Sequence, residues 1–393
     1  MDFSRVELSE QDSAFQAEVR AFLDEHVTDE VRRRDRETGD NFDEGVHLAM
    51  AAAGWLAAEL HREGGPQLNR LRERLWDLEK RRAEVPWVTW GTTKIVVPSV
   101  LRHGSKELQD EVLPGVLDGT VRLCLGYTEP DGGSDVASCK TRAVRDGDQW
   151  IINGSKMFTT GAHNSRYVFL ITNTDPTARK HKSLTMFLVP LDTPGIEIQG
   201  LRTVDGDRTN IVYYSDVRVH DRYRLGEVND GWAVLLGPLN EEHGVVDAAN
   251  DGLQDVSIMT HQGSTMATTV DRVAGLAADR VAEDASAAVR LGRSFAKLEA
   301  ALSAPHMFGR VALAQTMRDI SPDLMDVLGP AAALSADTDG AADEGAAGYL
   351  YRWAPLCGIY GGTLEVFRNM IAQHVLGLGR PAYAPPKKPV AAS

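Results

Sequence analysis

The sequence is poor in cysteine and has no long apolar run, and each shortage excludes a class of protein. Its 393 residues include three cysteines, Cys124, Cys139 and Cys357, and none stands at metal-ligand spacing from another cysteine or a histidine. We therefore expect buried thiols in a reducing compartment and no metal site. No run of 18 apolar residues occurs, so we expect no membrane-spanning helix.

The net charge and the first residues exclude further classes of protein. The chain has 56 acidic and 42 basic residues, which give a net charge of -14, and such a surface repels nucleic acid and anionic membranes. Residues 1–5 lack a basic stretch followed by an apolar one, so we expect no secretory signal peptide and a cytoplasmic protein. The length is sufficient for two or three domains with a substantial core.

The residue pattern changes twice along the chain. Residues 1–118 carry apolar residues at helical spacing, and Ser9 is a helix start signal. Residues 119–225 hold short β-rich segments separated by turn dipeptides such as Asp146-Gly147 and Pro194-Gly195, and residues 226–380 return to helical spacing. Residues 381–393 contain several prolines and are predicted to be irregular. These divisions predict an α+β fold with an N-terminal helical domain, a middle β-barrel or sandwich domain and a C-terminal helical bundle.

Two polar blocks stand out in the middle region. Residues 127–135, YTEPDGGSD, form a glycine-rich loop whose backbone N–H groups can approach a phosphate closely. Residues 153–161, NGSKMFTTG, begin with an Asn-Gly pair that predicts a turn leading into a strand of aromatic and β-branched residues. For either block alone, one β-hairpin with a glycine-rich turn is the simplest interpretation.

A third block, residues 360–369 with the sequence YGGTLEVFRN, lies near the C-terminus. The three blocks in this order resemble the acyl-CoA dehydrogenase family, and the resemblance covers nearly the whole chain. It implies an FAD-dependent enzyme that acts on acyl-CoA thioesters. The residues that it assigns to FAD are Thr128, Gly133, Ser134, Phe158, Thr159, Thr160, Thr363 and Glu365. It assigns Ser134 and His243 to contacts with the acyl-CoA substrate.

The chemistry of a flavin agrees with these residue types. Its ring is flat and apolar with polar atoms on the edge, so it needs an aromatic wall together with hydroxyl or N–H donors. Phe158 offers the aromatic wall, where many relatives carry tryptophan, and Thr128 and Thr160 offer hydroxyls.

The α-proton base does not stand where much of the family carries it. Dehydrogenation of a thioester needs a carboxylate in a dry site, where its pKa rises toward neutrality. In many relatives this glutamate directly follows the tyrosine of the third block, where this chain has Gly361. A minority carries it on the helix after the β region, and the matching position is Glu242.

The neighbours of Glu242 at three and four residues are all apolar, which favours it over Glu241 as a buried carboxylate. Asp247, one turn further on, is a weaker alternative. On chemistry alone, two adjacent glutamates near a helix start are more often solvated and simply favour the helix dipole.

Homotetrameric relatives carry two segments that reach the FAD of a neighbouring subunit. Residues 290–295 (RLGRSF) and 325–330 (MDVLGP) stand in those regions and match neither segment well. The resemblance therefore implies a homo- or hetero-oligomer, and we favour an α2β2 assembly in which a different, homologous subunit completes the FAD site. A homomer that holds FAD with other residues is the alternative.

We predict oxidation of an acyl-CoA to the trans-2-enoyl-CoA in fatty acid or steroid catabolism. Glu242 would be the base, flavin N5 the hydride acceptor, and an electron-transfer flavoprotein would take up the electrons. Two alternatives remain open. One is a non-catalytic or weakly FAD-binding partner subunit of a heterotetramer, and the other is a flavoprotein oxidase or monooxygenase.

Overall fold

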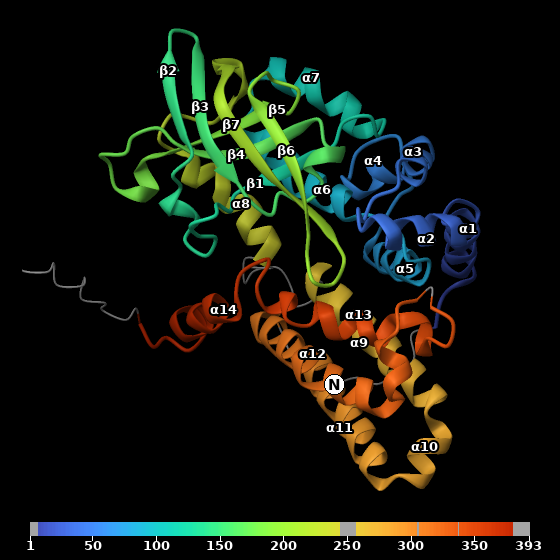
Figure 1. Ribbon diagram of the computed structural model, residues 1–393. Helices are drawn as coiled ribbons and strands as arrows, with labels where there is room; N and C mark the ends of the chain where they lie inside the picture. Colours follow the sequence, from blue (N-terminus) through green and yellow to red (C-terminus); the bar gives the residue numbers. More distant parts are fainter. Residues whose placement is uncertain (1–6, 244–256, 305, 337, 380–393) are drawn as a thin grey trace, which may run out of the picture. The chain divides into compact units, whose positions relative to one another are not determined.

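The computed structural model describes residues 7–243, 257–304, 306–336 and 338–379 (Figure 1). The chain divides into two compact units, residues 1–254 and residues 255–393. Helices, then strands, then helices follow one another along the chain, which confirms the predicted α+β fold class. The predicted irregular tail, residues 381–393, lies outside the described residues.

The first unit begins with helices. They are α1 (Glu10–His26), α2 (Asp29–Thr38), α3 (Glu44–Ala52), α4 (Trp55–Glu59), α5 (Arg70–Arg82), α6 (Val88–His103) and α7 (Lys106–Leu117). Ser9 caps α1 as predicted, because its hydroxyl accepts a hydrogen bond from the backbone N–H of Asp12 (3.1 Å). Val19 of α1 is fully buried in a core that also holds the rings of Trp55 and Trp76, stacked 4.0 Å apart.

The strands of the middle region form one eight-stranded sheet. They are β1 (Leu123–Gly126), β2 (Arg142–Asp146), β3 (Gln149–Lys156), β4 (Tyr167–Asn173), β5 (Leu184–Pro190), β6 (Ile196–Arg202), β7 (Arg208–His220) and β8 (Arg224–Leu225). The strand order is β6-β7-β3-β2-β4-β5-β8, and β1 runs parallel to β4. A single residue pair, Arg142 and Asn173, links β2 to β4, so the sheet has two halves joined at one point.

The two halves of the sheet share a core. Trp150 of β3 and Phe187 of β5 come from different halves, and their rings meet edge to face at 5.4 Å. On the other face of β4, Phe169 packs in a second core together with Val96 and Val100 of α6. Strands β4 and β5 are therefore covered on both faces, which explains their continuous apolar sequence.

One predicted turn is wrong and two are confirmed. Strand β3 continues through Asn153 and Gly154, where the pairing with β7 shifts register, so this pair forms a bulge within the strand and not a turn. Gly154 adopts φ +147°, and a Cβ there would lie 2.7 Å from the backbone of Thr141. The predicted turn at Gly147 (φ +66°) connects the paired strands β2 and β3, and the one at Gly195 (φ +94°) lies directly before β6.

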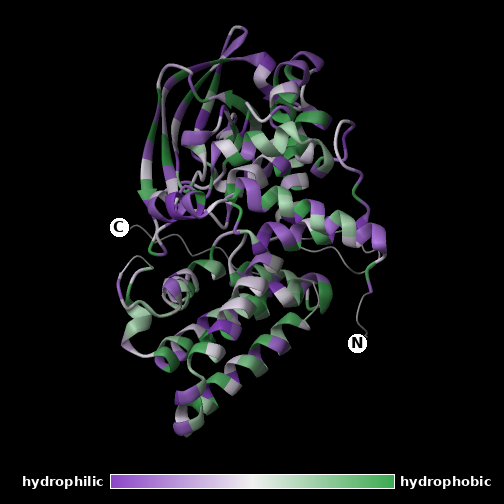
Figure 2. Cartoon of the chain, turned by 90° about the vertical axis from the view of Figure 1, so that its right-hand side faces the viewer, coloured by the Kyte–Doolittle hydropathy of each residue, from purple (hydrophilic) through white to green (hydrophobic). Residues whose placement is uncertain are grey.

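Helix α8 (Gly231–His243) follows the sheet in the first unit, and the second unit is helical. Its helices are α9 (Ser257–Leu276), α10 (Ala278–Glu283), α11 (Ala285–Leu302), α12 (His306–Leu328), α13 (Ala346–Trp353) and α14 (Leu364–Met370). Hydrophobic and hydrophilic residues alternate along these helices (Figure 2). Their apolar faces form a separate core that includes Val270 of α9, Leu298 of α11 and Met317 of α12.

Among the helices of the described residues, none combines the length and the apolar character that crossing a membrane requires.

Candidate functional site

The glycine-rich loop after β1 is folded tightly upon itself. Glu129 and Gly132 exchange two backbone hydrogen bonds, of 3.2 and 3.0 Å, which close a two-residue turn between them. A Cβ on Gly133 would lie 3.1 Å from the side chain of Thr128, so the loop backbone passes directly beside that residue. The loop therefore places Thr128, Gly133 and the exposed Ser134 close together.

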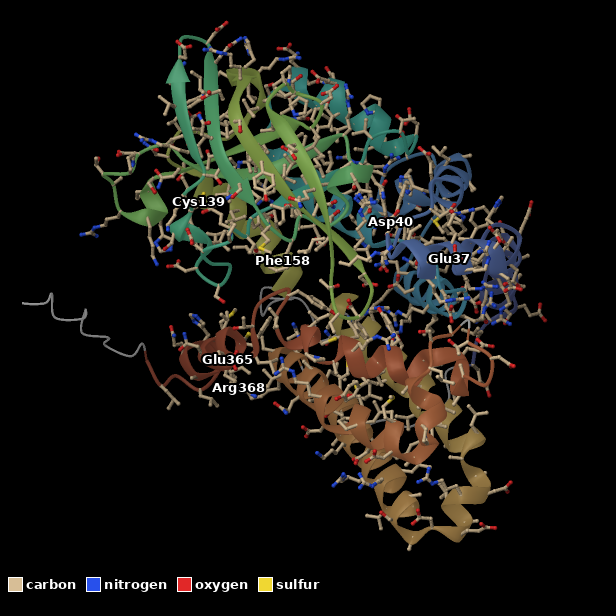
Figure 3. The ribbon with its side chains drawn as sticks, viewed as in Figure 1. Glu37, Asp40, Cys139, Phe158, Glu365 and Arg368 are labelled. Carbon is tan, nitrogen blue, oxygen red and sulfur yellow. The ribbon has the colours of Figure 1, made fainter. Side chains whose placement is uncertain are left out.

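The second predicted segment lies next to this loop. The backbone N–H of Met157 donates to the carbonyl of Thr128 at 2.8 Å. Phe158 follows, and Figure 3 shows it at the same end of the sheet as Cys139, which precedes β2. This backbone hydrogen bond thus helps to join the two blocks, which lie about thirty residues apart along the chain.

The backbone of Phe158 has an unusual conformation for a bulky residue. Its φ is +59°, in the left-handed region, and the N–H of Thr160 donates to its carbonyl at 3.0 Å. The strand predicted to run through this segment therefore ends at Lys156, and that prediction was wrong. The turn leaves 52% of the Phe158 side chain exposed, so a strained backbone presents an aromatic ring.

The two threonines after Phe158 are held by β7. Thr159 is fully buried and exchanges two hydrogen bonds with Asn210: its N–H donates to the Asn210 carbonyl (2.9 Å), and the Asn210 amide donates to its carbonyl (3.0 Å). The hydroxyl of Thr160 lies 3.1 Å from that of Thr209. Within the described part of the chain, the buried Thr159 hydroxyl has no hydrogen-bond partner.

A histidine extends this support toward the N-terminal helices. The amide of Asn210 lies 3.1 Å from Nδ1 of His163, whose Nε2 lies 3.0 Å from the carboxylate of Asp40. Burial and the nearby Arg208 lower the pKa of His163, against the opposing effect of Asp40. His163 thus links Asn210 of β7 to Asp40, which follows α2, as a neutral imidazole. Nothing in the local sequence around His163 indicated this role.

The third block forms a tight turn before α14 in the second unit. Gly361 and Gly362 both have left-handed backbones, with φ of +60° and +88°. The hydroxyl of Thr363 caps α14 by accepting from the N–H of Val366 at 3.2 Å. Glu365 lies in the first helical turn and is exposed, with Arg368 3.3 Å from its carboxylate (Figure 3). The left-handed backbone explains why glycine stands at 361.

The predicted base lies on α8. Glu242 and His243 are the last two residues of that helix, and their side chains lie outside the described residues, as does Asp247. At the start of α8, Gly231 lies so close to β5 that a Cβ would be 2.8 Å from the Leu184 carbonyl. Leu235 is fully buried one turn further on. The helix is thus anchored to the sheet at its beginning.

The residues present suit a flavin on two structural grounds. Phe158 supplies an exposed aromatic face, and the loop backbone packs so closely on Thr128 at Gly133 that a Cβ there would lie 3.1 Å from the Thr128 side chain, which suits a glycine-rich loop with backbone N–H donors. Two cavities of about 390 and 620 Å³ lie elsewhere in the first unit and share Asp40 in their walls. None of the predicted site residues lines either cavity.

Comparison with known proteins identifies the family. Models of the acyl-CoA dehydrogenase N-terminal, middle and C-terminal domains match residues 9–120, 124–217 and 299–376. Acyl-CoA dehydrogenase IpdE1 of Mycobacterium tuberculosis is 32% identical over 351 residues, which cover 85% of this chain and 87% of that protein.

Two solved structures extend the likeness to the whole chain. The Tcur3481-Tcur3483 steroid ACAD has a TM-score of 0.81 at 31% identity and covers 98% of this chain and 100% of that one. The ChsE4-ChsE5 complex from Mycobacterium tuberculosis has a TM-score of 0.79 at 27% identity, covering 96% and 100%. The chain belongs to the acyl-CoA dehydrogenase family of oxidoreductases.

Proposed function

We propose that the chain catalyses FAD-dependent α,β-dehydrogenation of an acyl-CoA thioester to the trans-2-enoyl-CoA. The observation that carries this proposal is the hydrogen bond from Met157 to Thr128, which brings the two predicted flavin-binding blocks to one end of the sheet. Membership of the family supports the reaction class, and the exposed ring of Phe158 supports a planar aromatic ligand.

The residues of the first unit would hold the cofactor from two sides. Phe158 would cover a face of the ring, Thr160 would offer its hydroxyl to the ring edge, and the loop around Gly133 would offer backbone N–H groups. Thr128, Ser134 and Thr159 would complete this part of the site. The family resemblance also assigns Thr363 and Glu365 to FAD binding. When bound, FAD supplies the hydride acceptor of the reaction.

Glu242 would remove the α-proton. A carboxylate at the end of α8 is the candidate because Gly361, where many relatives carry glutamate, lies in a left-handed turn that suits a residue without a side chain. Ser134 and His243 would contact the acyl-CoA.

We propose that a homologous subunit completes the site in an α2β2 assembly. The ChsE4-ChsE5 neighbour is described as a complex of two proteins, and the two segments expected to reach a neighbouring FAD are poorly matched here. The name of the Tcur3481-Tcur3483 neighbour makes a steroid-derived acyl-CoA a candidate substrate beside fatty acyl-CoAs. An electron-transfer flavoprotein would reoxidise the enzyme.

A non-catalytic partner subunit is the second candidate function. The absence of a carboxylate at Gly361 favours it, because the loss of the usual base is what a subunit retained for assembly would show.

Flavin content tests these proposals. The chain is purified alone and after co-expression with each homologous gene product encoded beside it, and FAD is measured per polypeptide. We expect little FAD in the lone chain and about half an equivalent per polypeptide in the mixed complex. A full equivalent in the lone chain would contradict the heteromeric proposal, and no flavin in any preparation would contradict the proposed chemistry.

A further inference from the structure

A buried ion pair lies directly beneath the glycine-rich loop. Lys156, the last residue of β3, has no exposed surface, and its Nζ lies 2.8 Å from the carboxylate of Glu129, which is 8% exposed. The thiol of Cys139 lies 3.3 Å from the same Nζ and 3.2 Å from the carboxylate. Two buried charges are costly unless each is paired and hydrogen-bonded, so the surroundings of this pair are informative.

The carboxylate of Glu129 has all its main partners within the protein. Besides Lys156, it accepts the backbone N–H of Thr141 at 2.8 Å and that of Lys140 at 2.7 Å. Burial alone would raise its pKa, but the charge of Lys156 and these hydrogen bonds hold the pKa of Glu129 at about 2. Burial raises the pKa of the Cys139 thiol to about 11, so this group stays neutral.

The pair joins three segments that are distant in sequence. Nζ of Lys156 also donates to the carbonyl of Tyr127 at 3.3 Å, so one ammonium group contacts both the loop carboxylate and the backbone just before Thr128. The glycine-rich loop starts at Tyr127, and β2 starts at Arg142, directly after Thr141. Phe158 follows Lys156 by two residues, so the pair sets the position of the loop relative to the exposed ring.

We propose that Lys156 and Glu129 are positioning residues that hold Thr128 and the glycine-rich loop at the correct distance from Phe158 for the flavin, an inference that rests on the proposed function. Lys156 has no exposed surface and Glu129 very little, so their role would be to hold the loop rather than to contact the cofactor. An apolar pair could fill the same volume, but it could not tie the Tyr127 carbonyl and two backbone N–H groups to one point. Fixing one arrangement is the best supported use of a buried ion pair.

Three variants test the proposal. Lys156→Met leaves the carboxylate without its cation. The double variant Lys156→Met with Glu129→Gln removes both charges and keeps one of the two oxygens, which can accept from Thr141 or from Lys140, because these N–H groups bond different oxygens of Glu129. Lys140→Met is the matched control, because it removes a lysine of the same region whose pair with Asp131 is exposed.

The measurements are the FAD dissociation constant, from titration of the flavin-free protein with FAD, and its melting temperature, made with whichever partner the wild type requires. We expect the double variant to melt within a few degrees of wild type but to bind FAD about 10²-fold more weakly, because a displacement of about 1 Å has such effects in active sites. Lys140→Met should match wild type in both measurements.

The pH dependence of FAD binding distinguishes a positioning role of the ion pair from a general loss of folded structure. In Lys156→Met the carboxyl of Glu129 keeps the backbone N–H donors of Thr141 and Lys140 and the neutral thiol of Cys139. It loses its contact with a cation, since the Lys140 side chain is held by Asp131. Burial then raises its pKa, so the protonated form fits better and FAD binding should strengthen as the pH falls. The wild type and the double variant should show no such trend, because neither has an unpaired carboxylate in this position.

An FAD dissociation constant in the double variant equal to that of wild type would overturn the proposal, and so would binding in Lys156→Met that does not change with pH. A wild-type protein that takes up no FAD would overturn the proposed function and this inference together, so the two failures are distinguishable.

Discussion

The two turns that carry the predicted FAD residues are each held by a buried cation from elsewhere in the sequence, and the two cations work differently. Lys156 binds a carboxylate and one carbonyl beneath the loop of the first unit. Arg310 of α12, 2% exposed, donates to the carbonyls of Cys357 (2.6 Å), Tyr360 (2.7 Å) and Gly362 (3.4 Å) in the second unit. The planar fork of arginine can satisfy several fixed acceptors, whereas lysine acts as a point charge.

The same backbone conformation is filled by different residues in the turn after β3 and in the turn before α14. Phe158 and Gly361 have φ of +59° and +60°. Glycine adopts this conformation freely, whereas for other residues it costs about 1 kcal/mol or more. The turn after β3 accepts that strain and presents an aromatic ring, whereas the turn before α14 needs only a change of chain direction. This difference supports the prediction that Phe158 has a functional role.

The largest effect on stability is expected at Arg310. Arg310→Met would leave three carbonyl groups of the turn without this donor, and we expect a loss of about 3 kcal/mol in the free energy of unfolding, measured with urea. Arg318→Met is the matched control on the same helix. Arg318 also donates to backbone carbonyls, to that of Pro355 at 2.8 Å in an exposed contact and to that of Ala354 at 3.4 Å in a partly buried one, so we expect a smaller loss of about 1 kcal/mol. Equal losses would show that burial of the contact does not matter.

A smaller effect compares glycine with alanine in both turns. Gly361→Ala should lower the free energy of unfolding by about 1 kcal/mol, because alanine fits the left-handed backbone poorly. At position 158, Phe158→Gly should be more stable than Phe158→Ala by a similar amount, since both lose the ring and only glycine relieves the backbone. If alanine were the more stable residue at either position, the assigned strain at that position would be wrong.

Much of the fold followed from the sequence because its signals are local. The cap at Ser9, the turns at Gly147 and Gly195, and the order of helices and strands all rest on neighbouring residues. The Asn153-Gly154 pair misled because the strand contains a bulge, and a bulge and a turn both favour glycine. The pairing partner on β7 decides between them, and it lies about sixty residues away.

The residues that hold the candidate site residues in place could not be predicted in the same way. Thr128 and Phe158 were identified from local blocks, but Lys156, Asn210 and Arg310 act on residues 27 to 52 positions away. Such contacts leave no pattern in a single sequence. The separation of the blocks along the chain also gave no reason to expect the hydrogen bond that joins Met157 to Thr128.

The most direct test of the proposed function is reduction of the bound flavin by an acyl-CoA without oxygen, followed as loss of the visible flavin absorbance. The flavin-loaded wild type should be bleached by a saturated acyl-CoA. Glu242→Gln should keep its FAD but be bleached about 10²- to 10⁴-fold more slowly, the range for loss of a general base. Glu241→Gln, one residue earlier on α8, should match wild type. Bleaching of Glu242→Gln at the wild-type rate would contradict Glu242 as the base.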